Sequence, residues 1–233
     1  MLCKENGLNE YNVYNIPIAP KVTNITQKTE YLREKLKIDK NKIIVLNSGS
    51  FKYFTCADEI MNTLDGWPKE YMLVVHTYYP ISSEDKYINR LKKYKSSNIR
   101  INEGDLSTDE YNVMVRSADI GIALYQGDDK LDNNIYNGKN IKMMGLSSGK
   151  LSMYASNALP IICSGNEVMK QLIAEYELGE YINSVSELPA SLLNIMKKKE
   201  VYSKESRRFF EEYLAFELHW PKVKEKIITI LDK

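Results

Sequence analysis

Residues 144–163 read Met-Gly-Leu-Ser-Ser-Gly-Lys-Leu-Ser-Met-Tyr-Ala-Ser-Asn-Ala-Leu-Pro-Ile-Ile-Cys, and this stretch decides the fold. A turn of small residues at 147–149 precedes a segment whose apolar side chains recur at helical spacing, namely Leu151, Tyr154, Ala155 and Ala158. Pro160 cannot continue a helix, and the apolar run 159–163 after it predicts a buried strand. The stretch therefore predicts one helix–strand unit of an α/β fold.

The start of this helix combines several groups that bind anions. Ser147 and Ser148 supply hydroxyls, Gly149 leaves the backbone accessible, and Lys150 adds an ammonium group. A helix N-terminus presents unpaired N–H groups and the positive end of the helix dipole, and both favour a phosphate or diphosphate. The alternative interpretation is an ordinary helix cap, because most helix starts in α/β domains bind no ligand.

Four apolar runs precede this unit, and the first three are each followed by a segment with helical spacing. The runs are 42–47, 71–77, 99–102 and 119–125, and the helices are predicted near 55–64, 83–94 and 107–118. Continuous apolar runs are typical of parallel strands that are covered on both faces. The sequence thus predicts an α/β fold with a doubly wound parallel sheet and extra carboxyl-terminal helices.

Some helix boundaries are predicted from capping and breaking residues. Thr55 with Asp58, and Ser107 with Glu110, match the capping-box pattern of a helix start. A further helix is predicted from the apolar spacing of Met169, Leu172, Ile173 and Tyr176, with Gly179 as its stop, and a short edge strand is predicted at 181–182.

The chain after residue 187 is predicted to be helical. Trp220-Pro221 is expected to break it between a helix over 204–218 and a last helix over 222–231.

Ligands of doubly wound sheets bind beyond the carboxyl ends of the strands, where the strand order reverses. The turn Ser48-Gly49-Ser50, the long polar segment 126–146 and the turn at 147–150 all follow strands. Gly49 permits close approach of a ligand, and Ser50 and Lys52 are candidates to bind a phosphate. A plain tight turn is the alternative for Gly49. The spacing favours one crevice rather than scattered turns.

Known nucleotide-binding motifs are absent from these turns. Gly49 lacks the two further glycines of a dinucleotide fingerprint, and Gly149-Lys150 lacks the upstream glycine spacing of a Walker loop. Leu151 also stands where a Walker loop needs Ser or Thr to bind magnesium. An NAD site and a P-loop are therefore disfavoured.

Metal and acid–base chemistry find little support. Three carboxylates of the long segment could ligate a cation, but solvated loop residues explain them more simply: Asp128, Asp129 and Asp132. Both histidines, His76 and His219, are interpreted as structural, and no catalytic triad can be assembled. The sequence therefore predicts no metal site and identifies no catalytic residue.

Composition excludes several classes of protein. The 233-residue chain has 43% hydrophobic residues and a net charge of +1, so it lacks the basic character expected of a nucleic-acid-binding protein. No run reaches the roughly 18–20 apolar residues of a membrane span, and no secretory pattern is present. Three widely spaced cysteines indicate free thiols in a reducing cytoplasm. A cytoplasmic protein is expected.

Four features carry a resemblance to a known family. An extended Pro-bounded segment at 12–20 leads into the first strand and its Ser48-Gly49-Ser50 turn. Residues 117–125, Ser-Ala-Asp-Ile-Gly-Ile-Ala-Leu-Tyr, look like a strand beside a variable loop. The Gly149-Lys150 turn, Tyr154 and the run 159–162 are similar to a "Gly-Lys … Glu-Tyr … Gly-x-Pro-Val-Ile" segment. Trp220 precedes the final helix. The chain from Asn12 onward resembles the carboxyl-terminal half of retaining, group-one GT-B glycosyltransferases.

The resemblance implies a Rossmann-like domain that binds a nucleotide-sugar donor, within a bacterial glycosyltransferase of the hexosyltransferase type and of polysaccharide biosynthesis. It implies that five residues hold the diphosphate: Gly49, Ser50, Ser148, Gly149 and Lys150. Tyr125 would face the base or the sugar, and four further positions complete the donor set: Lys52, Ser147, Met153 and Tyr154. Enzymes of this family need no metal for catalysis, so neither a metal nor another cofactor is expected.

The resemblance also implies a division of the chain. Residues 1–20 would end a preceding domain and form a linker, 21–218 would be the Rossmann-like domain, and 219–233 would cross back onto an amino-terminal acceptor domain. The chain is expected to lack that domain, to be incomplete as an enzyme, and to make any peripheral membrane contact through it. Three apolar residues of the last helix should then be exposed: Ile227, Ile230 and Leu231.

Some positions depart from the family pattern. Met153 stands where the family has a glutamate that binds the ribose hydroxyls, and a thioether is a weak acceptor. The segment 126–146 offers no counterpart of the family's upstream glutamate, and the basic residues after the first-strand glycine are reduced to Lys52. The alternative function is therefore a non-catalytic binding or scaffold domain. An epimerase-like sugar-nucleotide enzyme is a third hypothesis, for which a clear acid–base pair is missing.

Overall fold

The protein forms a six-stranded, all-parallel sheet flanked by helices. The computed structural model describes residues 7, 9, 13–14, 16–23, 27–78, 85–94, 98–126, 141 and 145–232. The strand order is β3-β2-β1-β4-β5-β6, with bounds β1 (Ile43–Ser48), β2 (Tyr71–Thr77), β3 (Ile99–Glu103), β4 (Ile120–Ala123), β5 (Ile161–Cys163) and β6 (Gly179–Tyr181). The predicted doubly wound, Rossmann-like α/β fold is confirmed.

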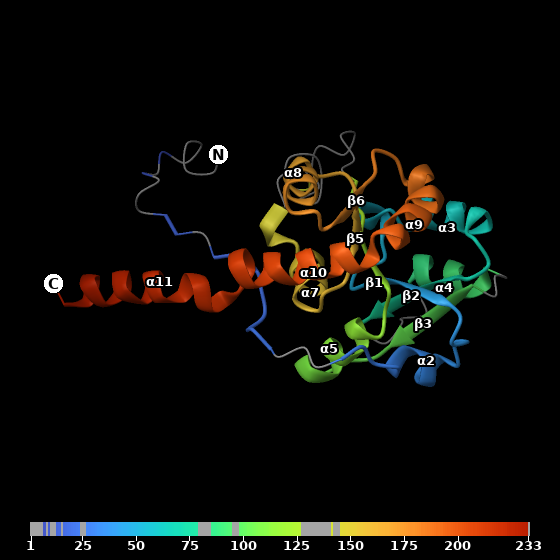
Figure 1. Cartoon of the computed structure of the whole chain (residues 1–233), viewed down its shortest axis with the longest axis horizontal. Helices are drawn as coiled ribbons and strands as arrows, with labels where there is room; N and C mark the ends of the chain where they lie inside the picture. The colour runs from blue at the N-terminus through green and yellow to red at the C-terminus, as the bar shows by residue number, and fades with distance from the viewer. Residues whose placement is uncertain are drawn as a thin grey trace.

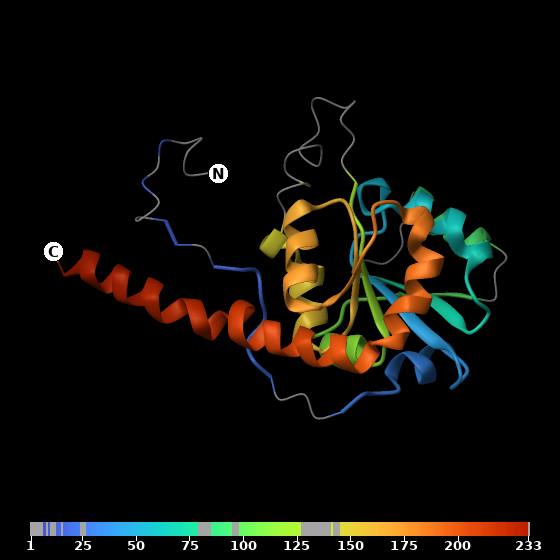
Figure 2. The same ribbon diagram turned by 45° about the horizontal axis from the view of Figure 1, so that its top comes forward.

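Helices cover both faces of the sheet (Figure 2). One face packs against α2 (Tyr31–Leu36), α5 (Thr108–Arg116), α7 (Gly149–Ser156), α8 (Glu167–Tyr176) and α10 (Lys199–Phe209). The other packs against α3 (Ala57–Thr63), α4 (Lys86–Lys93) and α9 (Leu188–Lys197). Short 3₁₀ turns link these elements: η2 (Tyr53–Thr55), η3 (Leu64–Gly66), η4 (Gly145–Ser147) and η5 (Val185–Glu187). Both cores bury apolar side chains, which explains the continuous apolar strand sequences.

Helix α7 lies close to the centre of the sheet because β4 contains a glycine. A Cβ atom on Gly121 would stand 2.5 Å from Cδ2 of Tyr154, whose ring is fully buried against this strand. Glycine at this position therefore allows the tyrosine ring to pack directly on the β4 backbone.

Of the two predicted capping boxes, one is confirmed and one is wrong. The Ser107 Oγ accepts a hydrogen bond from Glu110 N, and the Glu110 side chain accepts from Ser107 N, as the pattern predicts. Thr55 does not cap α3. Its hydroxyl oxygen accepts from Lys52 N at 2.9 Å, which tightens the turn after β1, and Cys56 in a left-handed conformation precedes α3.

Two predicted helix boundaries are also wrong. Helix α8 ends at Tyr176 because Glu177 adopts the left-handed conformation, whereas Gly179 begins β6 and a Cβ on it would stand 2.0 Å from Ile161 O. The chain bends at Ala215, after a π-helical turn over Phe210–Leu214. Pro221 lies inside α11, which the solvent-exposed backbone of that helix permits because water can bond the carbonyl left without a partner.

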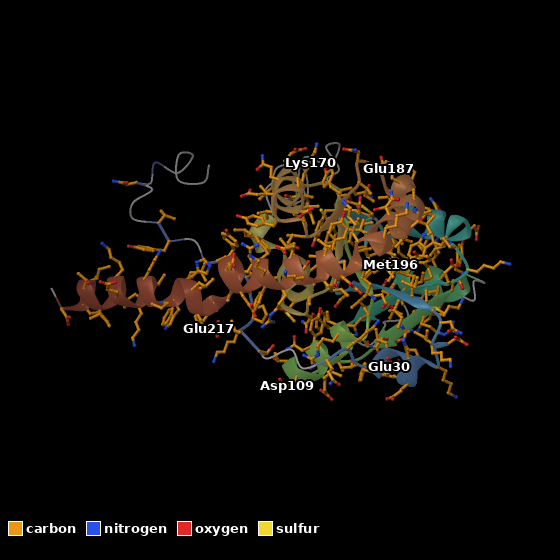
Figure 3. The ribbon with its side chains drawn as sticks, viewed as in Figure 1. Glu30, Asp109, Lys170, Glu187, Met196 and Glu217 are labelled. Carbon is orange, nitrogen blue, oxygen red and sulfur yellow. The ribbon has the colours of Figure 1, made fainter. Side chains whose placement is uncertain are left out.

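Helix α11 (Phe216–Leu231) projects away from the rest of the molecule (Figures 1 and 2). It has no buried residue, and the exposed fractions of Ile227, Ile230 and Leu231 are 45%, 61% and 77%. The expectation that these side chains are exposed is confirmed. At its start, the Glu217 carboxylate accepts a hydrogen bond from Val22 N at 3.3 Å (Figure 3). Among the described residues, no helix combines the length and apolar character needed to cross a bilayer.

Candidate functional site

The strand order reverses between β1 and β4, whose paired residues include Val45 with Ile120 and Leu46 with Gly121. In doubly wound sheets, ligands bind at the carboxyl edge of such a reversal. The turn after β1, residues 48–50, and the start of α7 meet at this edge. We call this place the anion corner and define it by Gly49, Ser50, Gly149 and Lys150.

The first residues of α7 carry backbone donors at the anion corner. Gly149 and Lys150 begin the helix, where amide N–H groups have no carbonyl partner within the helix. A Cβ atom on Gly149 would meet no heavy atom of the described residues within 4 Å, which leaves room for a ligand to approach this backbone.

The two predicted serines differ in their surroundings. Ser148 is buried, its hydroxyl oxygen accepts from Leu151 N at 3.2 Å, and it lies 3.0 Å from the Tyr125 hydroxyl. Ser148 therefore fixes the start of the helix. Ser147 is exposed at the end of η4.

Lys150 connects α7 to the turn after β1. Its Nζ donates to Asn47 Oδ1 at 2.7 Å and lies 3.5 Å from Ser50 O. It also lies 5.9 Å from the centre of the Tyr125 ring. Burial of the ammonium lowers the pKa of Lys150 to about 7. The protein thus gives the charged form of Lys150 little stabilisation at the anion corner. An anionic ligand would stabilise that charged form.

The turn after β1 contains a glycine with a positive φ angle. Gly49 has φ +92°, a value that side chains disfavour, and its N–H donates to His76 O at 3.0 Å. Ser50 is exposed, and its carbonyl accepts a hydrogen bond from the Thr55 hydroxyl at 3.0 Å. The turn therefore presents Ser50 beside Lys150.

Lys52 is engaged elsewhere. Its Nζ forms an ion pair of 2.5 Å with Asp85, the residue that caps the start of α4, and lies 5.9 Å from the Tyr87 ring centre.

Tyr154 and Met153 lie on the core side of α7. The Tyr154 hydroxyl donates to Leu46 O at 3.1 Å and accepts from Ser48 N at 3.0 Å, so it ties the helix to the end of β1. Met153 is half-buried and packs against the same apolar core. Tyr154 is fully buried and acts on the corner through Ser48.

Sequence reasoning missed Asn47, which is buried and receives the Lys150 ammonium. The available signal was a polar residue at the end of an otherwise apolar strand. The carboxylates Asp128, Asp129 and Asp132 lie outside the described residues. Within the described part of the chain, no cluster of three or more potential metal ligands occurs.

No protein-family model and no curated protein sequence matches the chain. Solved structures do match it. A glycosyltransferase from Rickettsia africae is 15% identical with a TM-score of 0.72, over 99% of this chain and 60% of that one. HepE from Anabaena, in complex with UDP and glucose, is 10% identical with a TM-score of 0.70, over 97% and 59%.

A third structure resembles the chain in extent as well as in fold. The carboxyl-terminal domain of the group 1 glycosyl transferase LpcC from Francisella tularensis is 12% identical with a TM-score of 0.55, over 82% of this chain and 92% of that one. The chain spans about 60% of the two longer proteins. The chain thus has the fold of a GT-B carboxyl-terminal domain.

Proposed function

We propose that this chain is the donor-binding domain of a glycosyltransferase and that it binds a nucleotide sugar with the diphosphate in the anion corner. The observation that carries the proposal is the junction of Lys150 and the first amides of α7 with the Gly49 turn, at the strand-order reversal. Amide donors and an ammonium group offer complementary charge to a diphosphate. The complex of HepE with UDP and glucose, on the same fold, supports this choice of ligand.

The same groups would assist transfer of the sugar. When the glycosidic bond to the diphosphate breaks, negative charge develops on the leaving oxygen, and preorganised donors lower the barrier by stabilising it. We assign this role to Lys150 and the α7 amides, with no metal or other cofactor required. The acceptor, and any contact with a membrane surface, would belong to a second, amino-terminal domain of a bacterial cytoplasmic enzyme that makes a glycan.

Isothermal titration with UDP and GDP tests the proposal. Lys150→Ala should weaken binding of the nucleotide that the wild type prefers by about 10- to 100-fold, because a charged hydrogen-bonding partner is removed. Lys204→Ala, which removes an exposed lysine of α10, is the matched control and should bind as the wild type does. If neither nucleotide nor the corresponding nucleotide sugars bind below the millimolar range, and Lys150→Ala changes nothing, the proposal is wrong.

The alternative is a binding or scaffold domain that no longer binds a nucleotide-sugar donor. Met153 motivates it, since this half-buried thioether packs against the core and offers no useful acceptor to a ribose. The titration separates the two functions, because a scaffold domain would bind neither nucleotide and would be insensitive to Lys150→Ala.

A further inference from the structure

A cavity lies at the carboxyl ends of β4, β5 and β6, and Tyr125 connects it to the anion corner. This cavity has a volume of about 570 Å³, within the range of roughly 300–1,000 Å³ that is typical of small-molecule sites. Its walls come from α3, from the residues that follow β4 and β5, and from the segment 183–186, which runs into η5. Figure 3 labels Glu187 at the end of that η5 wall.

The lining of this cavity is polar and almost uncharged. Most of its side chains carry hydroxyl or amide groups, namely Asn62, Thr63, Gln126, Ser164, Asn183, Ser184 and Ser186. Glu59 is the one charged side chain among the described residues that line it. Such a wall suits a ligand with many hydroxyl groups, and the carboxylate disfavours an anion.

Two polar atoms of the wall have unused hydrogen-bonding capacity. The Glu59 carboxylate accepts from Gln126 Nε2 through Oε1 at 2.9 Å, whereas its buried Oε2 has no partner among the described residues. Ser164 is 4% exposed, and its hydroxyl lies beside the Cys56 thiol without a nitrogen or oxygen partner in the described part of the chain. Buried polar atoms are rarely left unpaired in folded proteins, so both are suited to a ligand.

We propose that this cavity binds an uncharged sugar ring, with Glu59 Oε2 accepting a hydrogen bond from one ring hydroxyl and Ser164 bonding another. The amide of Gln126 holds the carboxylate in place for this contact.

Tyr125 joins the cavity to the anion corner. It lines the cavity, its hydroxyl lies 3.0 Å from Ser148 Oγ, and its ring centre lies 5.9 Å from Lys150 Nζ. The sugar ring therefore has two sources, the donor's own sugar or a separate saccharide. The first source rests on the proposed function, and the second is independent of it.

Ligand-observed NMR and titration calorimetry on the 233-residue chain test the proposal with four probes: methyl glucoside, glucuronate, UDP-glucose and UDP. The wild type should bind methyl glucoside at least tenfold more tightly than glucuronate. Glu59→Gln removes the negative charge of the side chain and keeps its shape, so this variant should bind methyl glucoside and glucuronate equally well. Ser164→Ala should weaken the binding of methyl glucoside several-fold. Glu200→Gln, an exposed glutamate of α10, is the matched control.

The measurements with UDP-glucose and UDP identify the source of the sugar ring. If the donor's sugar fills the cavity, Glu59→Gln weakens the binding of UDP-glucose and leaves the binding of UDP unchanged. Methyl glucoside then competes with UDP-glucose for the cavity. If a separate saccharide fills it, methyl glucoside and UDP-glucose bind together. The proposal is overturned if both cavity variants, folded by circular dichroism, bind every sugar as the wild type does, or if glucuronate matches methyl glucoside. Failure of UDP alone to bind speaks against the proposed function and not against the cavity.

Discussion

At the scale of single residues, Lys150 is the position where burial and charge oppose each other most directly. Its ammonium is bonded to an amide oxygen and a carbonyl rather than to a carboxylate, and burial lowers its pKa to about 7. A bound diphosphate would raise that pKa, so binding must take up protons at any pH where the free lysine is partly neutral.

Affinity for a nucleotide sugar should therefore depend on pH. Below pH 7 the free protein already holds charged Lys150, and affinity is constant. Above pH 7 affinity should fall, by up to about tenfold per pH unit, until the pKa of the complex is reached. Titration of UDP-glucose from about pH 6 to about pH 8.5 measures this slope, since its diphosphate has no terminal phosphate group to titrate. Lys150→Ala should give a flat profile, and an equally steep profile in that variant would contradict the assignment.

The sequence predicted which residues form the anion corner, but it did not predict the hydrogen bonds and ion pairs that hold them or their neighbours. Gly49 directly follows a predicted strand, and Gly149 and Lys150 begin a predicted helix, so local spacing placed all three at one edge of the sheet. The hydroxyl of Tyr154 bonds Ser48, 106 positions away, and Lys52 pairs with Asp85. Partners that are distant in sequence depend on the packing of whole elements, which spacing does not encode.

At the scale of elements, the contact between α7 and β4 sets the position of the corner. The Tyr154 ring packs on Gly121, and its hydroxyl holds Ser48 at the end of β1. Gly121→Ala should destabilise the fold by about 1–3 kcal/mol, because the new methyl group overlaps the ring in a packed core. Thermal unfolding should show a melting temperature lower by roughly 3–10 °C.

The same glycine-to-alanine change at Gly149 is the control for this prediction. A Cβ atom there meets no heavy atom within 4 Å in the described part of the chain, so Gly149→Ala should keep or slightly raise the melting temperature. Equal melting temperatures for the wild type and Gly121→Ala would show that α7 can shift without cost, and that Tyr154 does not fix the corner.

Element boundaries were predictable where one short motif decides them. The two hydrogen bonds of the Ser107–Glu110 capping box form within one helical turn, so the local sequence was enough to predict the start of α5. Glu177 ends α8 in a left-handed conformation that glycine usually supplies, whereas Gly179 is required by its proximity to β5. Ala215, and not Pro221, turns the chain, because the π-helical turn before it packs in the core. In both cases tertiary contacts override the local signal.

At the scale of the whole molecule, α11 is a helix that buries none of its residues. It leaves the body of the protein beside the segment 16–23 (Figure 1). Six of its apolar residues are more than 40% exposed: Leu218, Trp220, Ile227, Ile228, Ile230 and Leu231. The second, amino-terminal domain proposed above would cover this exposed apolar surface.

Truncation after Ala215 tests that inference, because an element that contributes nothing to the core can be removed without loss of folding. The truncated chain should melt within about 2 °C of the full chain, since it gives up exposed contacts such as that of Glu217 with Val22. It should also lose any concentration-dependent association seen in sedimentation, because exposed apolar surface promotes self-association. A large drop in melting temperature would mean instead that α11 folds back onto the sheet in solution, and the apolar stripe would then need no second domain to explain it.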